Sequence, residues 1–135
     1  RYGQMGNIEL QLSYVDHHEI LINTERSHLV PVLYDSSVRN NRYSSPNKFF
    51  EALALGKPVL SYPGCSVDEK VIEWDCGIVV PEGDVSALRE AVMSLRDDPD
   101  DWRRMSGNAR MAYDGRYSWD IMRKRLNDLY GRLLP

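Results

Sequence analysis

The sequence predicts an α/β fold in which helices cover both faces of a parallel sheet. Short apolar runs at residues 29–34, 58–62 and 77–80 are typical of strands buried on both sides. Segments with the period of amphipathic helices separate these runs, and this alternation is typical of right-handed βαβ units. One domain of this class suits a chain of 135 residues with 42% hydrophobic and 27% charged content.

In the amino-terminal half, the sequence predicts two units, each a strand followed by a helix. Residues 8–15 alternate apolar and polar side chains, as a strand with one wetter face does. Asp16 and Glu19 form a D-x-x-E capping pattern, which predicts a helix to about residue 27. After the strand at 29–34 we expect a polar loop over 35–43. A helix then follows with Ser45 as N-cap, Pro46 at the first helical position and Gly56 at its end.

The carboxyl-terminal half alternates in the same way. The strands at 58–62 and 77–80 are separated by a helix with Val67, Val71 and Trp74 on one face, and Asp84 is expected to cap the next helix. Three helices then carry apolar stripes, which predict core packing for Trp102 and Trp119. The stripes are Val85, Leu88, Val92 and Leu95; Trp102, Met105, Ala109 and Tyr113; and Trp119, Met122, Leu126, Leu129 and Leu133.

Composition excludes several function classes. A formal net charge of −3 gives no general attraction to nucleic acid or anionic membranes. Cys65 and Cys76 have neither metal-ligand nor disulfide-framework spacing, which favours free thiols in the cytoplasm. We find no hydrolase triad or metal-ligand pattern, and we expect no metal and no cofactor. The basic run at 123–125 fits a solvated helix face better than a membrane surface, which stays an alternative.

A binding site is predicted at the start of the helix in the stretch SSPNKFFEALALGKPV. In parallel sheets, ligands bind beyond the carboxyl ends of the strands, and this helix begins there. The backbone N–H groups near Asn47 and Lys48, the helix dipole and the Lys48 charge together favour a phosphate. Glu51, one turn further in, only accepts hydrogen bonds and therefore suits ribose hydroxyls. His17 and His18 also start a helix beyond a strand, where solvated histidines are commoner than ligand contacts.

This stretch, with the following GIVVPEGD and a helix beginning at Asp84, resembles the carboxyl-terminal domain of retaining GT-B glycosyltransferases of the GT4 group (group 1). The resemblance covers residues 7–134 and is specific over 43–84. It implies a Rossmann-like domain that binds a nucleotide-diphosphate sugar, with Glu51 on the donor ribose as the second of two family glutamates. Tyr43 stands at the position of the first glutamate. The sugar contact would then pass to Tyr43, Arg42 or Asn41, or the specificity would differ.

The resemblance also implies more chain than these residues supply. Two opening strands, a Gly-rich loop with an Arg/Lys pair and the acceptor domain are expected before Arg1. We therefore expect residues 1–135 to form one amino-terminally truncated nucleotide-sugar-binding domain, inactive alone. The implied enzyme is a hexosyltransferase of polysaccharide biosynthesis that uses a glycan or lipid-linked acceptor and no nucleic acid, in the cytoplasm or at the inner membrane face.

Strand order is a further expectation from the resemblance. The strands at 29–34, 58–62 and 77–80 should be adjacent. The strand at 8–15 should close beside 29–34 or pair with another chain, because an exposed strand edge is a template for pairing.

Two alternatives remain from other classes of protein. The first is a sugar-nucleotide epimerase on the related architecture, which needs acid and base residues at the sugar. The second is a non-catalytic Rossmann-like interaction module, which is consistent with Tyr43 in place of the first glutamate.

Overall fold

The computed structural model describes residues 7–8 and 11–133. Its sheet has three parallel strands, β1 (Val30–Val32), β2 (Val59–Ser61) and β3 (Gly77–Val79), in the order β1-β2-β3. Val59 is in register with Val30 on one side and with Gly77 on the other. The predicted adjacency of these strands is confirmed. The helices are α1 (His17–Arg26), α2 (Arg39–Tyr43), α3 (Asn47–Ala54), α4 (Asp68–Glu73), α5 (Val85–Asp97), α6 (Pro99–Ala112), the π-helix η2 (Tyr113–Tyr117) and α7 (Trp119–Leu133).

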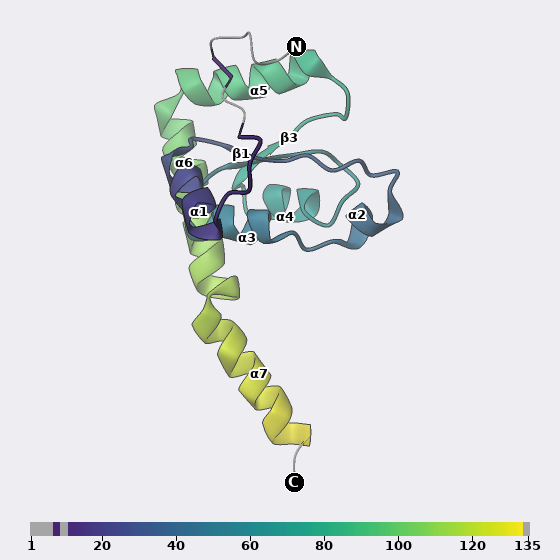
Figure 1. Ribbon diagram of the computed structural model, residues 1–135, viewed down its shortest axis with the longest axis vertical. Helices are drawn as coiled ribbons and strands as arrows, with labels where there is room; N and C mark the ends of the chain where they lie inside the picture. The colour runs from purple at the N-terminus through teal and green to yellow at the C-terminus, as the bar shows by residue number, and fades with distance from the viewer. Residues whose placement is uncertain (1–6, 9–10, 134–135) are drawn as a thin grey trace.

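Helices cover both faces of the sheet, as the sequence predicts (Figure 1). On one face, Phe49 of α3, Val71 of α4 and Val59 of β2 belong to a cluster of buried side chains. On the other face, Leu60 of β2 packs with Ala91 of α5 in a second cluster. Successive residues of β2 thus point into opposite cores, which is why the whole strand is buried and both Val59 and Leu60 are apolar.

The end of α3 is as predicted, but its start is not. Gly56 has a φ of 61°, and the N–H of Lys57 donates to the carbonyl of Ala52 at 2.8 Å, which closes a Schellman motif. At the other end the N-cap is Pro46, with extended backbone and no capping side chain, so the prediction of Ser45 as N-cap is wrong. The helical turn begins one residue later because the N–H of Phe49 bonds to the Pro46 carbonyl at 3.0 Å.

A short helix, α2, replaces part of the loop predicted over residues 35–43. Its entry is organised by Asp35, whose carboxylate accepts the Ser37 N–H at 2.7 Å. Hydrogen bonds from the Ser37 side chain and backbone lower the pKa of the Asp35 carboxyl. The Asn41 amide donates to the Asp35 carbonyl at 2.9 Å. These local bonds stabilise a helical turn in a polar segment, and the sequence has no apolar periodicity there from which the turn could be predicted.

The predicted strand at 8–15 falls partly outside the described residues, since 9 and 10 are not described. Residues 11–15 lie in no strand, and Leu12 and Tyr14 are 92% and 91% exposed. For these residues the prediction of a strand, and of its closure beside β1, is wrong. An alternating pattern becomes a strand only where a neighbour pairs with its backbone, and β1 pairs with β2 alone among the described residues.

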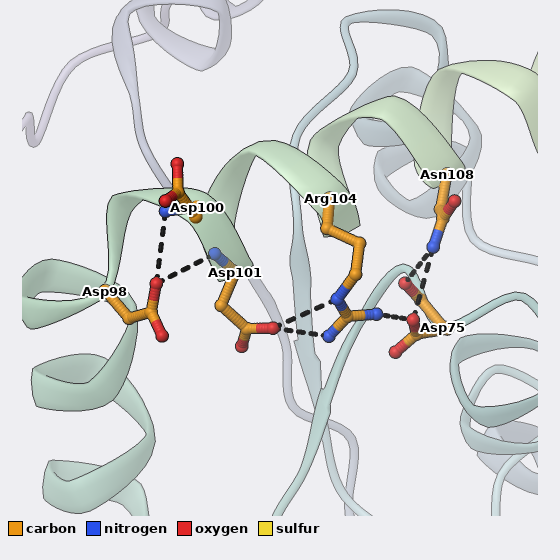
Figure 2. A network of polar contacts seen from close by, with 6 residues as sticks. All are labelled: Asp75, Asp98, Asp100, Asp101, Arg104 and Asn108. Atoms are coloured by element: carbon orange, nitrogen blue, oxygen red, sulfur yellow. Dashed lines mark hydrogen bonds and ion pairs between the residues drawn. The ribbon is translucent and has the colours of Figure 1, made fainter.

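The two helices after β3 are capped and anchored by acidic residues. Asp84 accepts the Ala87 N–H at 2.9 Å, as predicted for an N-cap. Asp98 stands between α5 and α6 and accepts two backbone N–H groups at the start of α6, those of residues 100 and 101, at 3.1 and 3.0 Å (Figure 2). From the next turn, Arg104 pairs with Asp75 ahead of β3. Trp102 is half-buried and donates to the His28 carbonyl at 2.7 Å, but it belongs to neither buried cluster, so it packs at the edge of the domain and not in the core as predicted.

The last helix leaves the body of the domain (Figure 1). α7 begins after Ser118, as predicted, but Trp119 is 68% exposed and Leu133 67%. The prediction that Trp119 packs in the core is therefore wrong. The apolar stripe is present along α7, but within the described residues its main contact is with η2, and most of the stripe stays exposed. Among the described residues, we find no helix with the length and apolarity needed to cross a membrane.

Candidate functional site

Two loops meet at the carboxyl ends of β1 and β2. The Ser66 N–H, in the loop after β2, donates to the Arg42 carbonyl at 3.0 Å, and the Ser66 hydroxyl donates to the Ser44 carbonyl. The Cys65 thiol donates to the Tyr34 carbonyl at 3.7 Å. These bonds fix the segment that leads from α2 into α3, and therefore the direction in which α3 begins.

The loop after β2 is itself tightly built. Gly64 has a φ of 85°, and a Cβ on it would lie 3.1 Å from the Cβ of Ser36 in the loop after β1. The Asp68 carboxylate accepts the N–H groups of Gly64 and Cys65 at 3.0 and 3.1 Å. Burial raises the pKa of the Cys65 thiol, which suits a packing role. In the sequence, the small residues 64–66 directly after a strand favour a turn over a lining of the cleft, and they give no sign of these bonds.

The start of α3 presents the predicted anion-binding groups. Asn47 and Lys48 occupy the first turn and are exposed, and no side chain caps that turn. Within the described part of the chain, neither side chain makes a hydrogen bond or ion pair. The first N–H groups of a helix have no partner within it, so they and the Lys48 ammonium are available to an anion.

Glu51 lies one turn further along α3 and is turned toward α1. Its side chain is 24% exposed, and Oε1 lies 3.7 Å from Nε2 of His17, the first residue of α1. The two residues are 34 positions apart, so no local pattern reveals this contact. The His17 side chain remains 66% exposed.

The other predicted site residues lie just before α3. Tyr43 ends α2 and is 77% exposed, and Ser45 is also exposed. The Arg42 guanidinium is occupied locally, because its Nε donates to the Ser36 carbonyl at 2.7 Å. The structure thus gathers the six predicted residues on one short segment, and it adds His17 beside Glu51.

A hollow of about 540 Å³ lies elsewhere, between α5 and α6. Trp102, Leu95 and the residues just before β1 line it, which places it at the amino ends of the strands, opposite to the predicted site. Among the residues that the structure describes, no group of three or more His, Cys, Asp or Glu side chains is arranged to hold a metal ion.

Comparisons with known proteins identify the family of the chain. The family model described as "Glycosyl transferases group 1" matches residues 44–112, which is more than half of the chain. The chain is similar to a GDP-mannose-dependent monoacylated alpha-(1-6)-phosphatidylinositol monomannoside mannosyltransferase of Corynebacterium glutamicum, with 33% identity over 81 residues. It is also similar to the capsular polysaccharide biosynthesis glycosyltransferase CapM of Staphylococcus aureus, with 25% identity over 142 residues.

The matches cover unequal shares of the proteins compared. The Corynebacterium match spans 60% of this chain and 21% of the relative, and the Staphylococcus match spans 96% and 37%. Sucrose-phosphate synthase from Thermosynechococcus elongatus superposes with a TM-score of 0.71 at 23% identity, over 88% of this chain and 28% of that one. This structural likeness shows the fold, that of a GT-B glycosyltransferase domain. The site segment from residue 44 through α3 lies inside the matched region, and by that match the chain belongs to the group 1 glycosyltransferase family.

Proposed function

We propose that this chain is the donor-binding domain of a GT4-type glycosyltransferase and binds a nucleotide-diphosphate sugar. The observation that carries the proposal is the uncapped start of α3 at the carboxyl edge of the sheet, with a half-buried carboxylate one turn behind it. Phosphate groups suit the first feature and ribose hydroxyls the second.

The diphosphate would lie at the N–H groups of Asn47 and Lys48. A helix terminus contributes about 0.3–1 kcal/mol toward an anion, so it orients the phosphate and leaves much of the affinity to other contacts. As the bond to the sugar breaks, negative charge grows on the leaving diphosphate, and the fixed N–H groups and the Lys48 ammonium stabilise it. In this scheme the positive charge comes from the protein, and no metal is required.

The sugar contact is assigned to the residues ahead of α3. Tyr43 is exposed, and its phenol both donates and accepts hydrogen bonds. Arg42 is held by Ser36 and contributes a fixed positive charge at the same edge. Ser45 lies between Tyr43 and the helix start, within the segment that would line the diphosphate.

The acceptor side of the reaction would come from outside these 135 residues, since the chain spans 21% and 37% of the two relatives above. One relative's name describes a mannosyltransferase that uses GDP-mannose and a phosphatidylinositol mannoside, and the other's describes capsule synthesis. We therefore propose transfer of a hexose, with retention, to a glycan or lipid-linked acceptor, in the cytoplasm or at the inner membrane face. The chain alone would bind donor without transferring it.

The test is nucleotide binding to the full chain by calorimetry, with GDP, UDP and ADP as probes. Loss of a hydrogen bond to a charged group costs about 1.5–3 kcal/mol, so Glu51→Ala should weaken binding at least tenfold. Glu90→Ala, an exposed glutamate on α5, is the matched control and should leave the affinity unchanged. A folded Glu51→Ala variant with full affinity would remove Glu51 from the site. The absence of binding by all three nucleotides would refute donor binding itself.

A further inference from the structure

We infer that His17 is a second ribose-binding residue and shares the sugar hydroxyls with Glu51. The inference rests on the proposed function, because it names a further contact for the same nucleotide. No motif of the stretch around α3 includes His17, and only the folded chain brings it to the carboxylate.

The distance between the two side chains is the first argument. Nε2 of His17 and Oε1 of Glu51 are 3.7 Å apart, beyond the range of a direct hydrogen bond. A hydroxyl oxygen placed beside the pair lies within about 2.8 Å of both atoms, which is an ordinary hydrogen-bond length. The two atoms are therefore spaced so that both can bond to one hydroxyl that lies beside them.

The chemistry of the two groups is the second argument. The carboxylate only accepts hydrogen bonds, whereas a neutral imidazole offers one N–H donor and one acceptor. A ribose hydroxyl that donates to Glu51 has its lone pairs left to accept from Nε2–H of His17. One ribose hydroxyl can thus donate to Glu51 and accept from His17, so the pair recognises the presence of that hydroxyl.

The placement of His17 is the third argument. The carboxylate of the N-cap Asp16 accepts the His18 N–H at 2.9 Å, which fixes the backbone at the start of α1. α1 buries none of its residues, and the His17 side chain is 66% exposed, so it is not a packed core histidine. A partly exposed contact of this length adds little to stability, so stability alone does not explain why His17 lies beside Glu51.

The experiment compares ribonucleotides with their deoxy forms on the full chain. Affinities are measured by calorimetry for GDP, 2′-deoxy-GDP and 3′-deoxy-GDP, and for the corresponding UDP series. His17→Ala is expected to weaken the ribonucleotide about tenfold and to weaken at least one deoxynucleotide by less than twofold, because that nucleotide lacks the hydroxyl that His17 holds. His17→Gln should restore part of the loss through its amide donor. His18→Ala, the adjacent matched control, should change neither affinity.

The possible results distinguish a failure of the role of His17 from a failure of nucleotide binding. If the nucleotides bind and Glu51→Ala weakens them, but His17→Ala leaves the preference for ribose intact, the inference is overturned and the proposed function stands. Equal losses for the ribonucleotide and both deoxynucleotides would make His17 a residue that acts through packing, and would also overturn it. If no nucleotide binds, both fall.

Discussion

Gly77→Ala should disrupt the join between β2 and β3. A Cβ on Gly77 would lie 1.9 Å from the carbonyl oxygen of Val59 and 2.7 Å from its carbonyl carbon and nitrogen. These are backbone atoms of the neighbouring strand, so no change of rotamer relieves the clash, and ordinary contacts of a Cβ start near 3.4 Å. β3 must therefore move away from β2 by more than 1 Å.

The cost follows from what that movement breaks. Overpacking a core costs about 1–3 kcal/mol, and a buried backbone group left without its partner costs about 1–3 kcal/mol more. The bond at risk is that from the Val59 N–H to the Cys76 carbonyl, at 3.0 Å, in the middle of the sheet. We expect the free energy of unfolding to fall by about 3–5 kcal/mol, a large share of the 5–15 kcal/mol typical of a domain.

Urea unfolding followed by circular dichroism measures this loss. Gly107→Ala is the matched control: Gly107 lies in α6, and a Cβ there would meet nothing within 4 Å. Because glycine in a helix interior is unfavourable, this control should gain about 0.5–1 kcal/mol. A loss below 1 kcal/mol for Gly77→Ala would show that the strands are not as close as described, and would refute the reasoning.

Three further predictions concern a cap, a thiol and the sugar contact. Asp98→Ala should lower the free energy of unfolding by about 1–2 kcal/mol through loss of the α6 cap, whereas Asp97→Ala, which breaks an exposed pair, should have no measurable effect in the same urea titration. Burial raises the pKa of the Cys76 thiol from 9.0 to about 11, so its contribution to stability is complete below pH 9 and is lost as the pH rises to 11. This loss is about 2–3 kcal/mol, and Cys76→Ala should flatten it; equal slopes for both proteins would contradict the assignment. In the complete enzyme, Tyr43→Ala should slow glycosyl transfer more than it weakens binding of the bare nucleotide, and equal effects on rate and affinity would place Tyr43 in general packing.

The sheet was predictable because its strands are short and buried on both faces. Val59 and Leu60 are both apolar since each enters a different core, and such runs are visible without any partner. Caps that act within one turn were equally visible, as with Asp84. Local physics therefore suffices for most of the elements, whereas the order of the three strands was expected from the family resemblance.

The predictions that were wrong failed for separate physical reasons. Ser45 has the side chain of an N-cap, but the carbonyl of Pro46 takes the first helical bond. The stripe that includes Trp119 has the period of a buried helix, yet burial needs a facing surface, which a period cannot supply. The fold class was enough to predict a binding site at the start of α3. The contact of His17 with Glu51 could not be predicted, because it depends on the position of α1 relative to α3.

The bonds from Ser66 tie the start of α3 to β2 as well as to β1. Residues 63–66 are therefore one support of the segment that leads into α3. We expect an inserted or deleted residue there to disturb the segment ahead of the anion-facing end of the helix without changing any residue of α3. The turn at Gly83, where an added Cβ meets nothing, has no such linkage and would absorb the same change. Variation in the length of residues 63–66 offers evolution, or an engineer, a way to retune this helix terminus from a neighbouring strand.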